Sequence, residues 1–145
     1  MPAFEGIDQH GNTFDSAQLK GQPAVVYFYP KDHTPGCTAE ACGFRDAYED
    51  FTALGAQVVG VSADSVKSHQ RFAQRHDLPF ILLADTDKSI HKKFRVGKQF
   101  FGLLNKRLTY VIDASGQIIQ VYENLLGTPH IKEALRSLKK NKMAS

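Results

Sequence analysis

The sequence predicts an α/β fold in which a central mixed sheet is flanked by helices. Three observations predict it. Short apolar runs rich in β-branched and aromatic residues recur along the chain, as buried strands require. Segments with helical spacing separate these runs, which favours parallel strands joined by helices. Towards the end of the chain, a strand, a turn and a second strand follow directly on one another, and this pattern adds an antiparallel edge.

The strand candidates are the apolar runs, each four to six residues long: 24–29, 57–61, 80–83 and 108–112. The segment "DASGQIIQVYE", residues 113–123, supplies the turn and the last strand of a terminal hairpin. We also expect an N-terminal β-hairpin extension ahead of the first of these strands.

The helix candidates show apolar residues at three- and four-residue steps. After Cys37 the repeat runs through Ala41, Phe44, Tyr48 and Phe51, and Gly55 is expected to end it as a C-cap. Further helices are predicted over 64–77, 87–94 and 129–140. This order of elements is typical of a thioredoxin-like fold.

Size and charge restrict the classes of function. The chain has 145 residues, of which 42% are hydrophobic and 23% charged, as expected for one domain over 1–145. Its net charge is +3, but the basic residues are scattered apart from Lys139, Lys140 and Lys142, so nucleic-acid binding is not expected.

The length of the apolar runs and the N-terminal residues indicate the cellular compartment. The apolar run at 24–29 is far shorter than the roughly 20 residues that a membrane span needs. The first residues, "MPAFEGIDQHG", lack the basic and then apolar layout of a secretory signal. We therefore expect a cytoplasmic protein, or an organellar one if a transit peptide has been removed.

The two cysteines, Cys37 and Cys42, carry the strongest chemical signal. Thr34 is expected to be the N-cap of a helix whose first residue is Pro35, which places Cys37 in the first turn. There, unpaired backbone N–H groups and the helix dipole favour a thiolate. A helix terminus contributes only about 0.3 to 2 kcal/mol, so an activated thiolate also needs a nearby cation. Arg45 lies about 12 Å further along the same helix and is a poor candidate.

The spacing of the two cysteines suggests a transient bond. On an α-helix, residues five apart have Cα atoms more than about 8 Å apart, whereas disulfides rarely tolerate more than about 7 Å. If Cys37 and Cys42 form a bond, the first turns of the helix must unwind. Such a bond is a step in a cycle rather than a structural staple.

Other uses of the cysteines fit less well. Two inert buried thiols remain an alternative, although the place of Cys37 in the first helical turn speaks against it. A zinc site needs about four ligands, and only His33 is near, so no metal is expected. A disulfide reductase of the thioredoxin type has two residues between its cysteines, and this chain has four.

These residues carry a family resemblance. The motif Pro30-x-x-x-Thr34-x-x-Cys37, followed by Cys42 inside "YFYPKDHTPGCTAEACGFRD", resembles peroxiredoxins of the bacterioferritin comigratory protein or PrxQ branch. The resemblance extends through "GVSADSVKSHQRFAQRHDLPFILLAD" and "RLTYVID", and more loosely through "PAFEGIDQHGNTF".

The resemblance implies a thiol peroxidase that reduces hydrogen peroxide and organic hydroperoxides without a cofactor. It implies that Cys37 is the peroxidatic cysteine, Cys42 the resolving cysteine, and Arg107 the missing cation. Thr34 would hydrogen-bond the peroxide and Pro30 would shield the thiolate from water. Thioredoxin or a similar dithiol would reduce the resulting disulfide, and the chain is expected to be a monomer.

Two points stay open at this stage. The same thiol chemistry would serve a redox sensor that switches a partner instead of turning over peroxide. Three roles are open for the segment around Phe100, Phe101, Leu103 and Leu104. It lines the entrance to the active site for organic hydroperoxides, docks the reductant, or folds onto the core. Glu40 is expected to be a solvated helix carboxylate unless it orients an arginine, and the histidines other than His33 receive no role.

Overall fold

The computed structural model describes residues 1–99, 102 and 104–144. A seven-stranded mixed sheet runs through its centre in the order β2-β1-β5-β4-β3-β8-β9. The strands are β1 (Glu5–Asp8), β2 (Thr13–Asp15), β3 (Ala24–Phe28), β4 (Gln57–Ser62), β5 (Ile81–Ala84), β8 (Leu108–Ile112) and β9 (Ile118–Glu123). A separate small hairpin is formed by β6 (Lys98–Gln99) and β7 (Leu104–Asn105).

The pairing of the strands agrees with the predicted architecture. β3, β4 and β5 are parallel, while β1, β2, β8 and β9 pair antiparallel with their neighbours. The antiparallel β1–β2 pair is the predicted N-terminal hairpin, and β8–β9 is the predicted terminal hairpin. The mixed thioredoxin-like α/β fold is therefore confirmed.

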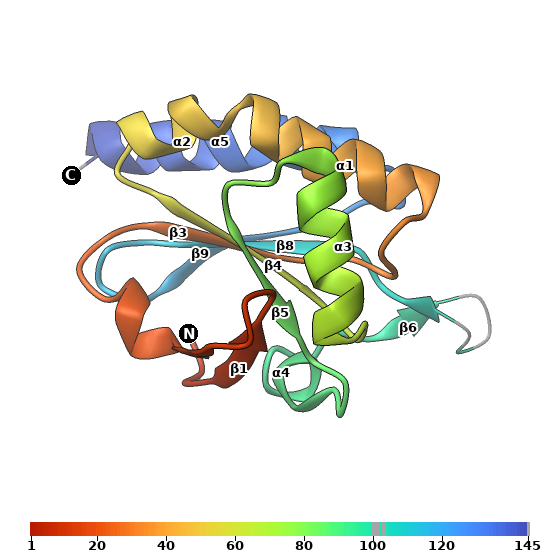
Figure 1. Cartoon of the computed structure of the whole chain (residues 1–145). Coiled ribbons are helices and arrows are strands. Elements are labelled where there is room, and N and C mark those ends of the chain that lie inside the picture. Colours follow the sequence, from red (N-terminus) through yellow and green to blue (C-terminus); the bar gives the residue numbers. More distant parts are fainter. Residues whose placement is uncertain (100–101, 103, 145) are drawn as a thin grey trace.

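The helices cover both faces of the sheet, as Figure 1 shows. They are α1 (Pro35–Asp46), α2 (Tyr48–Ala53), α3 (Val66–His76), α4 (Ser89–Lys93) and α5 (Thr128–Ala144), with a 3₁₀ turn at Ser16–Leu19. Among the described residues, no helix combines the length and the apolar character needed to cross a bilayer.

The expected helix from Cys37 to Gly55 is in fact two helices. α1 ends and α2 begins around Ala47, whose φ and ψ of −95° and 8° are not helical. The apolar spacing continues across the break, which is why the sequence pattern did not show it. Gly55 follows α2 with a φ of +73°, the left-handed conformation that a C-terminal glycine supplies.

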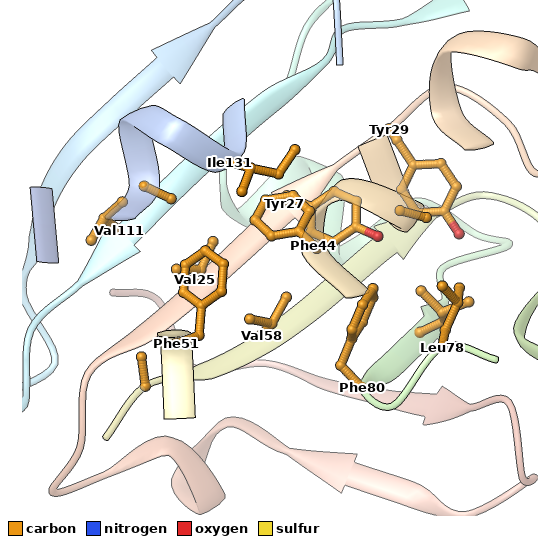
Figure 2. Close-up of a cluster of buried hydrophobic side chains, with 14 of the residues drawn as sticks. Val25, Tyr27, Tyr29, Phe44, Phe51, Val58, Leu78, Phe80, Val111 and Ile131 are labelled. Atoms are coloured by element: carbon orange, nitrogen blue, oxygen red, sulfur yellow. The ribbon is translucent and has the colours of Figure 1, made fainter. Parts of the chain in front are cut away.

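The buried side chains form one cluster on each face of the sheet. One cluster joins β3 and β4 to α1, α2, α3 and α5, and Figure 2 shows Tyr27, Phe44 and Phe51 among its members. The rings of Tyr27 and Phe44 stack with their centroids 4.5 Å apart. Phe44 belongs to α1 and is fully buried, so this packing holds α1 against the sheet.

Candidate active site

The first turn of α1 holds Cys37 as the sequence predicts. Thr34 is the N-cap residue, in extended conformation, and Pro35 is the first helical residue. Cys37 is 1% exposed and starts the buried stripe that continues with Ala41 and Phe44. Both cysteines are free thiols in this structure.

A cation from a distant part of the chain meets Cys37. Arg107 lies directly before β8, is 6% exposed, and donates from Nη2 to the Cys37 sulfur at 3.4 Å. The absence of a side chain at Gly36 permits this approach, since a Cβ there would lie 3.1 Å from Arg107 Nη2. Arg45 is engaged elsewhere, with Asp46 and with the His76 carbonyl oxygen.

Three groups fix the Arg107 guanidinium. Besides the sulfur, it donates from Nη1 to Glu40 Oε1 at 2.6 Å and from Nε to the carbonyl oxygen of Leu125 at 3.0 Å. Leu125 belongs to the loop between β9 and α5, and Gly127 of the same loop packs against the first turn of α1. A planar guanidinium held at three nitrogens has little freedom to leave the sulfur.

Glu40 is buried, contrary to the expectation of a solvated carboxylate. It lies one turn after Cys37 on α1, is 0% exposed, and its Oε1 accepts from Arg107, which is the arginine contact that the sequence left open. Burial raises the pKa of Glu40 to about 8, against the opposing effect of the Arg107 charge. Its Oε2 has no hydrogen-bond partner among the described residues.

His130, on α5, lies beside Glu40, with Nδ1 3.7 Å from Glu40 Oε2, although no role was expected for it. Its Nε2 faces the carbonyl oxygen of Asn124 at 3.0 Å, so this nitrogen carries the ring proton and Nδ1 accepts from the Thr109 hydroxyl at 2.7 Å. Burial lowers the pKa of His130 to about 4. The signal was present in the sequence, because His130, Ala134 and Leu138 share the buried face of α5.

Cys42 lies on α1 itself, at the predicted spacing, and is partly exposed. The intact helix separates the two Cα atoms by more than about 8 Å and points the side chains about 140° apart around the axis. The structure therefore holds the cysteines on one helix but not in bonding geometry.

Thr34 and Pro30 lie in the loop that precedes α1. The Thr34 hydroxyl donates to the carbonyl oxygen of Lys31 at 2.7 Å rather than capping the helix. Pro30 is half-buried and lines a cavity of about 280 Å³ together with Lys31, Asp64, Leu104 and Asn105, among others. Cys37 does not line this cavity. Phe100, Phe101 and Leu103, named as a possible entrance, lie outside the described residues.

The arrangement suits attack by sulfur on a polar bond. A thiolate at Cys37 would face a fixed positive charge and the N–H groups of a helix start, both of which stabilise an anion. The same groups would stabilise negative charge that develops on an atom leaving the sulfur.

The chain is similar to known proteins over almost its whole length. The AhpC/TSA family model matches residues 1–121. The chloroplastic peroxiredoxin Q of Sedum lineare is 47% identical over 94% of this chain and 74% of that protein. The peroxiredoxin Bcp of Bacillus subtilis is 41% identical over 95% of this chain and 91% of that protein. The chain spans 63% to 65% of the length of six further chloroplastic peroxiredoxin Q relatives.

Solved structures give the same grouping. Peroxidoxin BcpB from Mycobacterium tuberculosis superimposes with a TM-score of 0.89 at 34% identity, covering 97% of this chain and 94% of that chain. A Xanthomonas campestris bacterioferritin comigratory protein, studied for its alkyl peroxide reduction activity, has a TM-score of 0.89 at 32% identity, covering 95% and 91%.

Proposed function

Because the chain belongs to the AhpC/TSA family and is a peroxiredoxin of the Q and Bcp type, we propose that Cys37 is the sulfur that attacks the peroxide. The observation that carries this proposal is the Arg107 guanidinium 3.4 Å from a buried sulfur at a helix N-terminus. Peroxiredoxins are thiol peroxidases, so a peroxide is the substrate and a thiol is the reductant.

In the first step the Cys37 thiolate attacks one oxygen of a hydroperoxide and the O–O bond breaks. The sulfur becomes a sulfenic acid, and the departing oxygen takes the electron pair and a proton to give water or an alcohol. Arg107 and the backbone N–H groups of the first turn of α1 stabilise the charge on that oxygen. Thr34, whose hydroxyl is at the helix start, is proposed to hydrogen-bond the peroxide, and Pro30 to restrict water.

In the second step Cys42 condenses with the sulfenic acid, which releases water and forms the Cys37–Cys42 disulfide. Since both cysteines lie on α1, a single chain can complete this step, in line with a monomer. Residues 1–145 would then act as one catalytic domain. An external dithiol such as thioredoxin would restore both thiols, and a cytoplasmic or organellar compartment that maintains such a reductant fits this cycle.

The test is peroxide consumption coupled to a dithiol reductant. Wild type is expected to turn over many equivalents of hydrogen peroxide per chain, and Cys37→Ser to consume none. A single stoichiometric oxidation of wild type without recycling would indicate a redox sensor instead. Retained turnover in Cys37→Ser would contradict the assignment of the attacking sulfur.

A further inference from the structure

A second buried polar cluster lies beneath the loop that precedes α1. At its centre are Asp32, in that loop, and His69, on α3. Asp32 is 3% exposed and His69 is 0% exposed, and the carboxylate oxygen Oδ2 lies 2.6 Å from His69 Nδ1. Neither residue touches Cys37 or Arg107 through a hydrogen bond in the described part of the chain.

The carboxylate of Asp32 accepts from three donors. Besides His69, the Tyr29 hydroxyl donates to Oδ1 at 2.6 Å and the Ser68 hydroxyl donates to Oδ2 at 2.8 Å. Hydrogen bonds from three donors stabilise the charged form of a carboxylate, which favours an ionised Asp32. Burial alone would raise the pKa of Asp32, yet its hydrogen bonds and the His69 charge lower it below the ordinary value.

Both ring nitrogens of His69 face acceptors. Nδ1 faces the ionised Asp32, and Nε2 faces the backbone carbonyl oxygen of Leu83 on β5 at 2.9 Å. A carbonyl and a carboxylate can only accept, so each ring nitrogen has to donate and the ring carries both protons. His130 differs, because the hydroxyl of Thr109 supplies a donor to one of its nitrogens.

The cluster also fixes the backbone of the loop. The Asp32 N–H donates to Asp64 Oδ2 at 2.8 Å, and the same oxygen accepts from the Ser62 hydroxyl at 2.6 Å. Asp32, Asp64 and His69 come close enough together to suggest a metal site. The near oxygens and the ring nitrogens are already engaged in these hydrogen bonds, so the cluster is complete without an ion.

The residue after Asp32 is held in an uncommon conformation. His33 has a φ of +63°, in the left-handed region that residues other than glycine rarely adopt. Its ring packs edge-on against Phe72 of α3, with centroids 5.2 Å apart. Such a conformation persists only where the surrounding residues enforce it. At His33 it changes the direction of the backbone between Asp32 and Thr34, just before α1.

We propose that Asp32 and His69 form a buried ion pair that positions the loop from Pro30 to Thr34 for the peroxide reaction. They are positioning residues and do not contact the substrate. The pair fastens the loop at once to α3, to β5 and to the loop after β4, so that Thr34 meets the helix start at a fixed place. This inference rests on the proposed function for its kinetic consequence, but the ion pair itself does not.

The groups that face the pair are Tyr29 at the end of β3, Asp64 after β4 and Ser68 on α3. Tyr29 keeps its proton, because burial and the Asp32 charge raise the pKa of its hydroxyl well above the ordinary value. The described contacts of the cluster include no second cation, so the imidazolium is the charged partner of Asp32.

The first test counts ring protons by ¹H–¹⁵N correlation spectroscopy of the reduced protein at pH 7. His69 is expected to show two ring N–H signals and His130 one, with each set assigned by its loss in a His→Gln variant. A single N–H signal for His69 would overturn the ion pair. This result does not depend on whether the chain reduces peroxide.

The second test measures the rate at which hydrogen peroxide oxidises Cys37 in Asp32→Asn. We expect the rate constant to fall by about 10- to 100-fold, since small displacements of positioning groups have effects of this size. The matched control is Asp85→Asn, which removes the charge from a second buried Asp–His pair. The groups that donate to the Asp85 carboxylate belong to Ser89, Ile90 and His91, all on α4. We expect the control to react at the wild-type rate.

Stability separates positioning from mere support. If Asp32→Asn and Asp85→Asn lower the thermal midpoint alike and the folded Asp32→Asn reacts at the wild-type rate, the proposal is wrong. Should Asp32→Asn not fold, Ser68→Ala removes one donor to Asp32 and is expected to slow the reaction in the same direction; an unchanged rate there would also overturn it. If wild type itself fails to react, the proposed function fails, and the ring protons still decide the ion pair.

Discussion

The guanidinium of Arg107 donates to the sulfur of Cys37 at 3.4 Å, although the two residues are 70 positions apart in the chain. The contact exists only when β8 and α1 have both docked on the sheet. Folding therefore assembles the electrostatic environment of the sulfur, which the helix start alone supplies only in part.

Replacement of the cation should slow the first chemical step. We expect Arg107→Ala to lower the rate constant for Cys37 oxidation by about 10²- to 10³-fold, the usual effect of removing one group that stabilises developing charge. Stopped-flow measurement with hydrogen peroxide checks this. Arg107→Lys keeps the charge, but its three donors share one nitrogen and cannot span the acceptors that the planar guanidinium reaches, so it should restore the rate only in part.

The control for Arg107 is an arginine of the surface. Arg136 has a side chain that is 75% exposed and pairs with Glu133, so Arg136→Ala should react as wild type does. A wild-type rate in Arg107→Ala would show that another group activates the sulfur.

Glu40 should make the stability of the fold decrease as the pH rises. Its folded pKa is about 8 and its ordinary value is 4.5, so between these values the folded chain holds a proton that the unfolded chain has lost. The free energy of unfolding falls with pH wherever the folded state binds more protons. His130 acts in the opposite direction, but only between about 4 and 6.5, because its folded pKa is lowered.

Above pH 6.5 the contribution of His130 fades, and a comparison of wild type with Glu40→Gln cancels the titrations that the two proteins share. Between pH 6.5 and 8, wild type should lose about 2 kcal/mol of unfolding free energy relative to Glu40→Gln, which has no proton to release. Urea unfolding of both proteins under reducing conditions, at pH 6.5 and 8, measures the difference, with the exposed Glu49→Gln as the control for the substitution. Parallel curves for wild type and Glu40→Gln would contradict the raised pKa.

Cys42→Ser should separate the two chemical steps. The first peroxide reaction should proceed at close to the wild-type rate, because Cys42 does not contact Arg107 or Cys37 in the intact helix. With no second thiol in the chain, Cys37 sulfenic acid should accumulate, and dimedone labelling followed by mass spectrometry detects it. Formation of an intramolecular disulfide is impossible in this variant, so the absence of sulfenic acid would mean that Cys37 is not oxidised first.

Local signals allowed much of the site to be predicted. The helix start at Thr34-Pro35 and the placement of both cysteines on that helix depend on neighbouring residues alone, and the structure has both. The strands and the terminal hairpin followed from apolar runs and turn residues. Arg107 beside Cys37 came from family resemblance, since no local pattern links residues so far apart.

Features that depend on tertiary packing were missed. Glu40 looks like any helix carboxylate until Arg107 and the loop after β9 cover it. His69 and His130 are fully buried and have polar partners from other elements. The local sequence around each histidine does not predict those partners. The β6–β7 hairpin has only two residues in each strand, which is too short for an alternating pattern to register.

Oxidation should melt the start of α1 while the rest of the fold stays protected. A Cys37–Cys42 bond needs Cα atoms within about 7 Å, whereas the helix holds them more than about 8 Å apart. The unwinding should stop before Phe44, whose buried ring stacks on Tyr27. Hydrogen exchange with mass spectrometry should therefore show lost protection over residues 34–43 after one equivalent of peroxide, unchanged protection in β3, and recovery with dithiothreitol. Cys42→Ser treated in the same way should keep its protection, because it cannot form the bond. A disulfide confirmed by mass in a chain whose residues 34–43 remain protected would show that the helix closes the bond without unwinding.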